Sequence, residues 1–182
     1  MRVIAGTARR LQLRTVKGMD TRPTTDRIKE TLFNMLQPDL PGCSFLDLFA
    51  GSGGIGIEAL SRGATRAVFV ERDRKAAECI RDNLALTHLD GKGSLLVCDV
   101  FKALEMMRGD EPFDLIFMDP PYDHEIERRV LEALPGTGLV TRETKIIVEA
   151  SEKTDFSYLD QLGYRTEKRK EYKTNVHMFL RR

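Results

Sequence analysis

The sequence predicts an α/β protein in which helices cover both faces of a mainly parallel β-sheet. From residue 44 onward, short runs rich in β-formers alternate with longer runs whose apolar residues recur at helical spacing. Four strand–helix units in succession need crossover connections, and these place the strands parallel to one another. A chain of 182 residues can bury one core and is short for two ordinary domains.

The four units can be placed from these patterns. Within the last of them, Ile126, Val130 and Leu134 repeat at helical spacing. Asp123 stands where it can cap that helix, and Glu125 and Glu127 suit its first turn. The predicted strands and the helices that follow them are 44–50 with 54–63, 66–71 with 73–89, 94–100 with 101–108, and 113–118 with 124–134.

The C-terminal part predicts the remaining strands. The run KIIVEA at 145–150 reads as a fifth strand, and the runs 164–172 and 176–182 are separated only by a short KTN turn. Such close spacing is typical of an antiparallel hairpin. We therefore expect a seven-stranded sheet that is mainly parallel and ends in an antiparallel C-terminal strand.

The N-terminal part predicts a small extension. The runs RVIAG and LQLRT suggest a β-ribbon, and TTDRIKETLFNML at 24–36 suggests a helix that packs partly on the body. We expect the extension to occupy residues 1–40 and the main domain to occupy residues 41–182.

Composition excludes several classes of protein. Hydrophobic residues make up 41% of the chain and charged residues 31%, as in ordinary globular proteins. The sequence contains no signal-peptide pattern and no apolar run of the roughly 20 residues that span a bilayer, so we expect a cytoplasmic protein without membrane contact. Three scattered cysteines form neither a disulfide framework nor a zinc motif, and no metal is expected.

Positive charge is concentrated in two segments although the net charge is only +1. Such segments either contact phosphates or form a solvated charged edge, and charge alone does not separate the two interpretations. The first segment, residues 1–29, contains Arg2, Arg9, Arg10, Arg14, Lys17, Arg22, Arg27 and Lys29 against Asp20 and Asp26. The second contains Arg165, Lys168, Arg169, Lys170 and Lys173.

The glycine-rich turn after the first strand indicates a nucleotide-type ligand. Gly51, Gly53 and Gly56 satisfy the G-x-G-x-x-G pattern, which alone fits any nucleotide-binding βαβ unit or a plain tight turn. Asp47 disfavours a dinucleotide, because its carboxylate would face an anionic pyrophosphate. The ammonium group of S-adenosylmethionine would be attracted to the same carboxylate.

Two more acids follow neighbouring strands. Glu71 could bind the ribose hydroxyls of S-adenosylmethionine, and Asp99 could accept from the adenine amine. Each acid alone could equally be a turn or cap residue. Because ligands of open α/β sheets bind beyond the carboxyl ends of the strands, three acids at three consecutive strand ends favour a cofactor site.

The turn DPPY at 119–122 indicates chemistry on a planar amine. Neither Pro120 nor Pro121 can donate to a β-ladder, so the strand ends in a stiff turn. Asp119 and the carbonyl of Pro120 could accept hydrogen bonds from an aromatic amine and direct its lone pair at a methyl donor. Tyr122 could stack on a base that has left its helix. The plainer interpretation is a proline turn before a helix.

These motifs together resemble a known family. The segments DLFAGSGGIGIEALSRGA, FVERD and FDLIFMDPPY are similar to class I S-adenosylmethionine-dependent methyltransferases with a Rossmann-like fold. The segments RVIAGTARRLQL and TRPTTDRIKETLFNML resemble the RsmD family, which methylates the exocyclic amine of a guanine in small-subunit (16S) ribosomal RNA. The resemblance extends from residue 2 to the C-terminal hairpin.

The resemblance implies a set of site residues. For the cofactor, S-adenosylmethionine, these are Asp47, Phe49, Ala50, Gly51, Ser52, Gly53, Glu71, Arg72, Asp99 and Val100. For catalysis they are Asp119, Pro120, Pro121 and Tyr122. For RNA they are the family loop residues Arg22, Pro23 and Thr24, joined by Arg9, Arg10 and Arg27 of the basic segment. The implied partner is 16S ribosomal RNA or the small ribosomal subunit, bound by a monomer.

Three other readings stay open at this point. An enzyme of the same fold could methylate another planar amine, in DNA adenine, protein glutamine or a small molecule, although the chain has no room for a separate DNA-recognition domain. The glycine turn could serve an NAD-dependent oxidoreductase. A non-catalytic RNA-binding or assembly module could retain the fold, but it would not require the DPPY turn.

Overall fold

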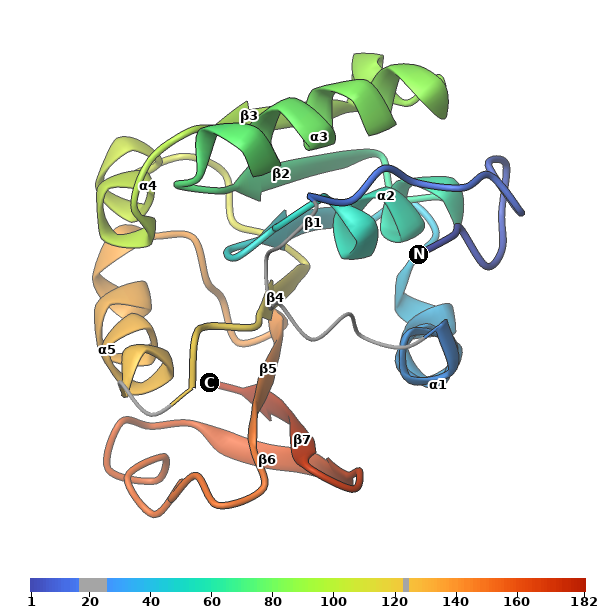
Figure 1. Ribbon diagram of the computed structural model, residues 1–182. Coiled ribbons are helices and arrows are strands. Elements are labelled where there is room, and N and C mark those ends of the chain that lie inside the picture. The colour runs from blue at the N-terminus through green and yellow to red at the C-terminus, as the bar shows by residue number, and fades with distance from the viewer. Residues whose placement is uncertain (17–25, 123–124) are drawn as a thin grey trace.

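A seven-stranded sheet with strand order β3-β2-β1-β4-β5-β7-β6 forms the centre of the molecule (Figure 1). The structure is a computed structural model that describes residues 1–16, 26–122 and 125–182. Strands β1 to β5 run parallel, and β7 pairs antiparallel with both β5 and β6. The strands are β1 Ser44–Asp47, β2 Arg66–Val70, β3 Gly93–Leu96, β4 Leu115–Met118, β5 Lys145–Ser151, β6 Arg165–Glu171 and β7 Asn175–Arg181.

The helices agree with the predicted strand–helix alternation. Each predicted helix is present with ends that differ by a few residues, and the fold class and C-terminal hairpin are confirmed. The cap predicted at Asp123 lies outside the described residues. The helices are α1 Asp26–Leu36, α2 Gly54–Ser61, α3 Arg74–Leu86, α4 Val100–Met106 and α5 Ile126–Ala133, with short 3₁₀ helices at Gln37–Asp39, Asp90–Lys92 and Leu134–Thr137.

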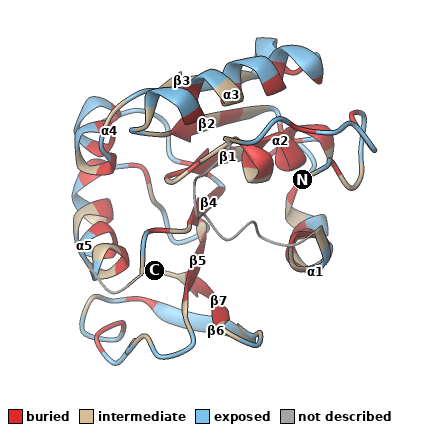
Figure 2. Cartoon of the chain, viewed as in Figure 1, coloured by how far each residue is buried: buried red, intermediate tan, exposed pale blue. Residues whose placement is uncertain are grey.

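Two buried clusters lie on the two faces of the sheet. Alternate residues of a strand point to opposite faces, so Phe45 and Phe117 join one cluster with α1, α2 and α3. Leu46 and Ile116 join the other cluster with α4 and α5. Figure 2 shows the central strands buried and the outward sides of the helices exposed. A sheet covered on both faces in this way needs nearly continuous apolar strands, and β4 is buried along its whole length.

The predicted N-terminal ribbon is reduced to a single antiparallel bridge between Arg2 and Gln12. Backbone hydrogen bonds extend it on either side, from Val3 to Leu11 and from Leu13 to Met1, each 3.0 Å long. Val3 and Leu13 lie in the same buried cluster as the residues of α1 and the sheet. The N-terminal arm, residues 1–16, therefore shares a core with the main body.

The two strands of the hairpin differ in exposure. β7 is buried at every residue from Asn175 to Leu180. β6 forms one edge of the sheet, and its residues are exposed except for the partly covered Lys170. The strand at the opposite edge of the sheet, β3, has only four residues.

Candidate active site

The candidate site lies at the carboxyl ends of the strands, where the strand order reverses between β1 and β4. The chain passes from β1 outward to β2 and β3, then returns to place β4 and β5 on the other side of β1 (Figure 1). Such a reversal is where open α/β sheets bind ligands. Asp47 is the last residue of β1. Glu71 directly follows β2, and Asp119 directly follows β4. Asp99 comes after a short loop that follows β3. The structure thus brings all four predicted acids to one edge of the sheet.

The glycine turn leads from β1 into α2 with little room for side chains. Gly53 has a φ of 83° and stands directly before α2, in the left-handed region that favours glycine. A Cβ atom on Gly56 would lie 2.3 Å from the ring of Phe69. The backbone amide of Gly51 donates to Oε2 of Glu71 at 2.8 Å. The predicted glycine pattern therefore packs α2 tightly on the sheet, and Glu71 fixes the turn.

Asp47 is a buried carboxyl group whose hydrogen bonding is incomplete. Its side chain is 1% exposed, and Oδ2 accepts a hydrogen bond of 3.2 Å from the amide of Gly56. Oδ1 is buried and has no hydrogen-bond partner among the described residues. Burial raises the pKa of Asp47 to about 7, and the nearby charge of Glu71 adds to the increase. A buried carboxyl group with one oxygen lacking a hydrogen bond favours a ligand that brings a positive charge or a hydrogen-bond donor.

The acids after β2 and β3 bind backbone groups at the starts of helices. Glu71 accepts through Oε1 from the amide of Asp73 at 2.8 Å, directly before α3. Asp99 is exposed and accepts from the amide of Phe101 at 2.9 Å, which caps α4. In this structure Asp99 is therefore the N-cap residue of α4, which is the plainer of its two interpretations. Of the other predicted cofactor residues, Phe49 and Ser52 are partly buried, Ala50 and Val100 are buried, and Arg72 is exposed.

The DPPY turn continues β4 beyond its last ladder residue. Pro120 is buried and Pro121 exposed, while Asp119 and Tyr122 are each partly buried. Burial raises the pKa of Asp119 well above its ordinary value, and the negative charges of Glu149 and Asp47 raise it further. A carboxylate with a raised pKa is a stronger base than an exposed aspartate.

Sequence reasoning missed a buried polar group beside this turn. Glu149, near the carboxyl end of β5, accepts hydrogen bonds from Asn175 at 2.5 Å and from His177 at 2.8 Å. Both donors belong to β7, and Glu149 and His177 are 5% and 0% exposed. One signal could have found it, because Glu149 is an acid in the apolar run KIIVEA at the same sheet edge as the other four.

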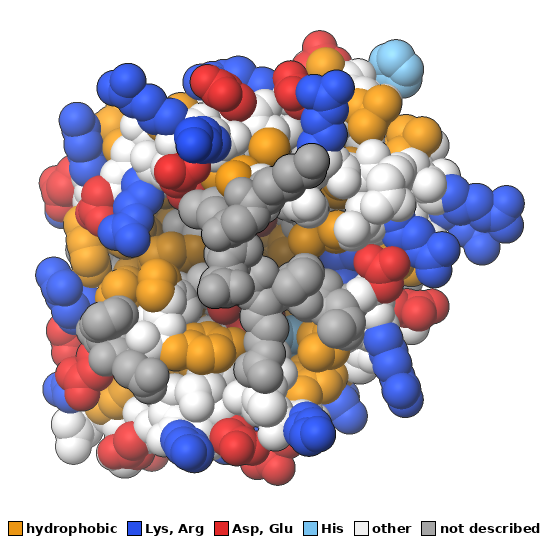
Figure 3. All heavy atoms as spheres, viewed as in Figure 1, with side chains coloured by type: hydrophobic (Ala, Val, Ile, Leu, Met, Phe, Trp, Pro, Cys, Tyr) orange, Lys and Arg blue, Asp and Glu red, His pale blue; other side chains and the backbone are white. Residues whose placement is uncertain are grey.

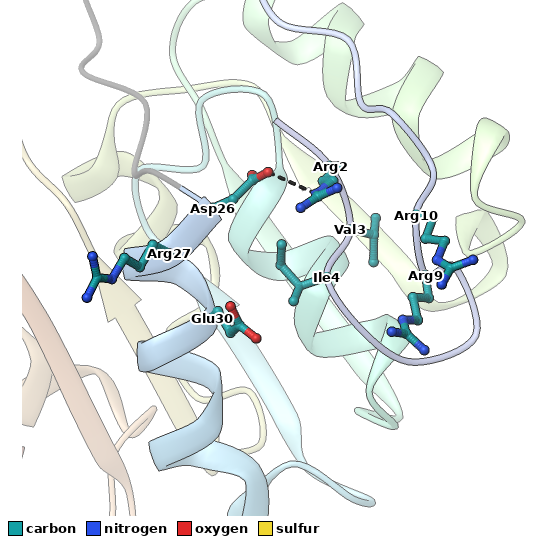
Figure 4. Close-up of a pocket in the computed structure, with 8 residues that line it drawn as sticks. All are labelled: Arg2, Val3, Ile4, Arg9, Arg10, Asp26, Arg27 and Glu30. Atoms are coloured by element: carbon teal, nitrogen blue, oxygen red, sulfur yellow. Dashed lines mark ion pairs between the residues drawn. The ribbon is translucent and has the colours of Figure 1, made fainter.

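A second feature is a basic cavity of about 510 Å³ between the N-terminal arm and α1. Arg9 and Arg10 extend from the loop of the arm on one side, and Arg2 pairs with Asp26 of α1 at 3.0 Å (Figure 4). Arg27 extends from α1 away from the two arm arginines. Figure 3 shows Lys and Arg side chains projecting on the side where Figure 1 draws the arm. The lining residues are Arg2, Val3, Ile4, Arg9, Arg10, Asp26, Arg27 and Glu30.

Three of the predicted RNA-binding residues line this cavity, and the other three are outside the part of the chain that the structure describes. Arg9, Arg10 and Arg27 are among its lining residues. Arg22, Pro23 and Thr24 lie outside the described residues. The second basic segment lies mainly on the exposed edge strand β6, where Arg169 pairs with Glu171 at 2.9 Å.

Comparison with known proteins identifies the family. A model of the family described as "Conserved hypothetical protein 95" matches residues 1–180. The chain belongs to this family. A relative in Bacillus subtilis named "Putative rRNA methyltransferase YlbH" is 41% identical over 150 residues, which cover 82% of each chain. A relative in Escherichia coli K12 named "Ribosomal RNA small subunit methyltransferase D" is 35% identical over 82% of this chain and 74% of its own.

Solved structures agree with the fold. The structure described as "Putative methyltransferase yhhF from Escherichia coli" has a TM-score of 0.85 and 31% identity, and covers 100% of this chain and 97% of its own. The structure described as "Crystal structure of SMU.776, a putative methyltransferase complexed with SAH" shares the fold at a TM-score of 0.66 and 14% identity, over 82% of this chain and 49% of its own. The predicted RsmD membership and the class I methyltransferase fold are confirmed.

In residues 1–16, 26–122 and 125–182, no group of three or more His, Cys, Asp or Glu side chains is arranged to hold a metal ion. No helix in the same part of the chain is long and apolar enough to cross a membrane.

Proposed function

We propose that this family member transfers a methyl group from S-adenosylmethionine to the exocyclic amine of a guanine in small-subunit (16S) ribosomal RNA. The observation that carries the proposal is the DPPY turn at the end of β4, next to the glycine turn after β1 at the point where the strand order reverses. The names of the Bacillus subtilis and Escherichia coli relatives support ribosomal RNA as the substrate.

The acids at the sheet edge fit S-adenosylmethionine. When bound, this group supplies an electrophilic methyl whose bond to a sulfonium breaks with the electron pair going to sulfur. The buried and unpartnered Oδ1 of Asp47 would accept from the ammonium of the methionine part. Glu71 would hold the ribose and Asp99 the adenine, with Phe49, Ala50, Gly51, Ser52, Gly53, Arg72 and Val100 completing the pocket. A neighbouring cation also favours the charged form of the buried carboxyls.

The DPPY turn would prepare the amine. The exocyclic amine of a purine is a poor nucleophile because its lone pair is delocalised into the ring. Hydrogen bonds from its two N–H groups to Asp119 and to the carbonyl of Pro120 would turn the lone pair toward the methyl donor and stabilise the positive charge that develops on nitrogen. Pro121 would stiffen the turn, and Tyr122 would stack on the base, which is worth about 1–3 kcal/mol per base.

The N-terminal extension would bind RNA phosphates. Arg9, Arg10 and Arg27 line the basic cavity, and the loop with Arg22, Pro23 and Thr24 belongs to the same extension. We propose that residues 1–40 contact RNA and residues 41–182 carry the chemistry. On this proposal the protein acts in the cytoplasm as a monomer on 16S RNA or the assembling small subunit.

The test is the transfer of labelled methyl to unmodified small subunits, free 16S RNA, duplex DNA and total protein, followed by nucleoside analysis. We expect label as methylguanosine in one of the RNA samples. Asp119→Ala should reduce kcat by about 10²–10³-fold, as loss of a transition-state acceptor does, while S-adenosylmethionine affinity changes little. Asp90→Ala is the matched control, because Asp90 is exposed at the opposite end of β3.

Other results would contradict the proposal in distinct ways. Label in DNA or protein with none in RNA would assign the same fold to another planar amine. Full turnover of Asp119→Ala would remove Asp119 from the reaction. Calorimetry that detects NAD binding in place of S-adenosylmethionine would reject the methyltransferase chemistry altogether.

A further inference from the structure

Glu149 lies beside the catalytic turn on the same face of the sheet. β4 and β5 are parallel neighbours, and their last paired residues are Met118 and Val148. Asp119, directly after β4, and Glu149, within β5, are the next residues after this pair. Because side chains alternate between faces and neighbouring strands lie about 4.8 Å apart, both carboxyl groups project to one face, on adjacent strands.

Two side chains of β7 hold the carboxyl group of Glu149 in place. Nε2 of His177 and Nδ2 of Asn175 contact different oxygens of the carboxylate, at 2.8 and 2.5 Å. Since a carboxylate can only accept, Nε2 of His177 carries the proton in this pair. Nδ1 of His177 lies 3.4 Å from the hydroxyl of Tyr172, and Phe117 contacts the ring edge-to-face. Neither Glu149 nor His177 has a buried polar atom without a partner.

The surroundings of Asp119 are predominantly negative. Among the described residues, the charged groups that act on its carboxyl are Glu149 from β5 and Asp47 from β1. The groups that in turn face Glu149 are His177, Asn175 and Tyr172, from β7 and the residues just before it. Burial and both neighbouring acids raise the pKa of Asp119.

We infer that Glu149, held by His177 and Asn175, is a positioning residue that makes Asp119 the proton acceptor for the methylated amine. The inference rests on the proposed function. When the amine nitrogen gains a methyl group it carries one positive charge and must lose one proton to become neutral. Asp119 takes that proton and later releases it to water. An exposed aspartate is a weak base at neutral pH, and a fixed negative charge on the adjacent strand makes it a stronger one.

The test combines Glu149→Gln with two readouts. In the cofactor-free protein, a ¹³C NMR titration of the Asp119 carboxyl should move to lower pH, because a neighbouring negative charge has been removed. In the pH profile of kcat, the acid limb should move in the same direction while the plateau falls roughly tenfold, as expected for a weaker base. The KM for RNA should stay within about twofold, since Glu149 is buried and on this inference acts only through Asp119.

Three variants separate this role from a structural one. His177→Gln keeps an N–H donor for Glu149 and should retain most of the wild-type profile, whereas His177→Leu should resemble Glu149→Gln. Glu167→Gln, in the exposed strand β6, removes the same charge from the hairpin surface and should move neither readout. Urea denaturation of each variant reports loss of stability separately from the two readouts.

The outcomes distinguish the two proposals. A Glu149→Gln protein that is less stable but has the wild-type Asp119 titration and acid limb would overturn the inference. A wild-type protein that methylates no RNA would overturn the proposed function. In that case the cofactor-free titration still decides whether Glu149 controls the proton affinity of Asp119.

Discussion

Two buried acids, one within α2 and one at the end of β1, differ in how their negative charge is compensated. Glu58, in α2, is 0% exposed and lies between Lys29 at 3.3 Å and Arg62 at 2.7 Å. Its two oxygens also accept from the backbone amides of Ile4 and Ala5 in the N-terminal arm, at 2.8 and 3.0 Å. This acid is surrounded by donors and cations and clamps the arm onto α2.

Asp47, only a short stretch of chain away, lacks such compensation. It accepts from Gly56, and no ion pair to it is formed by a described Lys or Arg. Its pKa is raised by burial, while burial of Lys29 lowers the pKa of that amine and Glu58 opposes the decrease. The contrast teaches that charge balanced within the protein marks a structural cluster, and charge left unbalanced marks a site for a cationic ligand.

The largest effect that we predict breaks the balanced cluster. Glu58→Ala leaves the buried Lys29 without its carboxylate and removes the acceptor of two arm amides. The free energy of unfolding should fall by about 3–5 kcal/mol, as it does when one partner of a buried pair is removed. Urea denaturation followed by circular dichroism measures the change.

The double variant Glu58→Met with Lys29→Met provides the control for this prediction. Removing both charges leaves fewer unpaired ions, so the loss of stability should be smaller than for Glu58→Ala. A single variant as stable as the wild type would mean that the arm is held by apolar contacts alone.

The second largest effect is the pH dependence of stability that Asp47 causes. Because folding raises the pKa of Asp47 from 3.8 to about 7, the folded protein binds this proton more tightly than the unfolded chain does. The contribution of Asp47 to stability is therefore lost as pH rises from about 4 to 7, by roughly 4 kcal/mol at most. Asp47→Asn should make the stability of the cofactor-free protein depend less on pH across this window.

The Asp47→Asn variant should also bind the cofactor more weakly. Loss of a charged acceptor should lower the affinity for S-adenosylmethionine by about 10–100-fold, corresponding to a charge-assisted hydrogen bond of roughly 1.5–3 kcal/mol. Denaturation at pH 4.5 and 7.5 and calorimetry with the cofactor measure the two effects. An unchanged affinity would place the ammonium of the cofactor away from Asp47.

The smallest effect is expected at the basic cavity, whose charge is exposed and screened by salt. Arg9→Glu with Arg10→Glu should weaken RNA binding and reduce the slope of log affinity against log salt by about 0.7–0.9 for each lost phosphate contact. Binding titrations at several salt concentrations measure the slope. Lys92→Glu with Lys153→Glu, on exposed residues outside the cavity and outside both basic segments, controls for net charge. Equal slopes in both double variants would exclude a specific role for the cavity.

Sequence alone predicted the elements whose signals are local. Short runs rich in β-formers placed β1, β2 and β4, and helical spacing placed α3 and α5, because both signals come from neighbouring residues. The acids at the strand ends were found for the same reason. The ends of β1 were less accurate, since residues 48–50 are apolar but belong to the turn that leads to the glycines.

The polar clusters could not be predicted because their partners are distant in the chain. Lys29 and Glu58 lie in helices where charged residues are ordinarily exposed, and both become buried only where α1, α2 and the N-terminal arm meet. Glu149 meets His177 through the antiparallel register of β5 and β7. Such register depends on the whole sheet, so a glutamate and a histidine 28 residues apart give no local signal.

The exposed edge strand β6 has a consequence for the behaviour of the protein at high concentration. A strand with unpaired backbone groups can add a strand from a second molecule and begin an aggregate. β6 carries charged side chains at six of its seven positions, RTEKRKE, and the other edge of the sheet is the short strand β3. If the β6 strands of two molecules paired, many charged side chains would leave water. The sheet therefore resists growth beyond its seven strands.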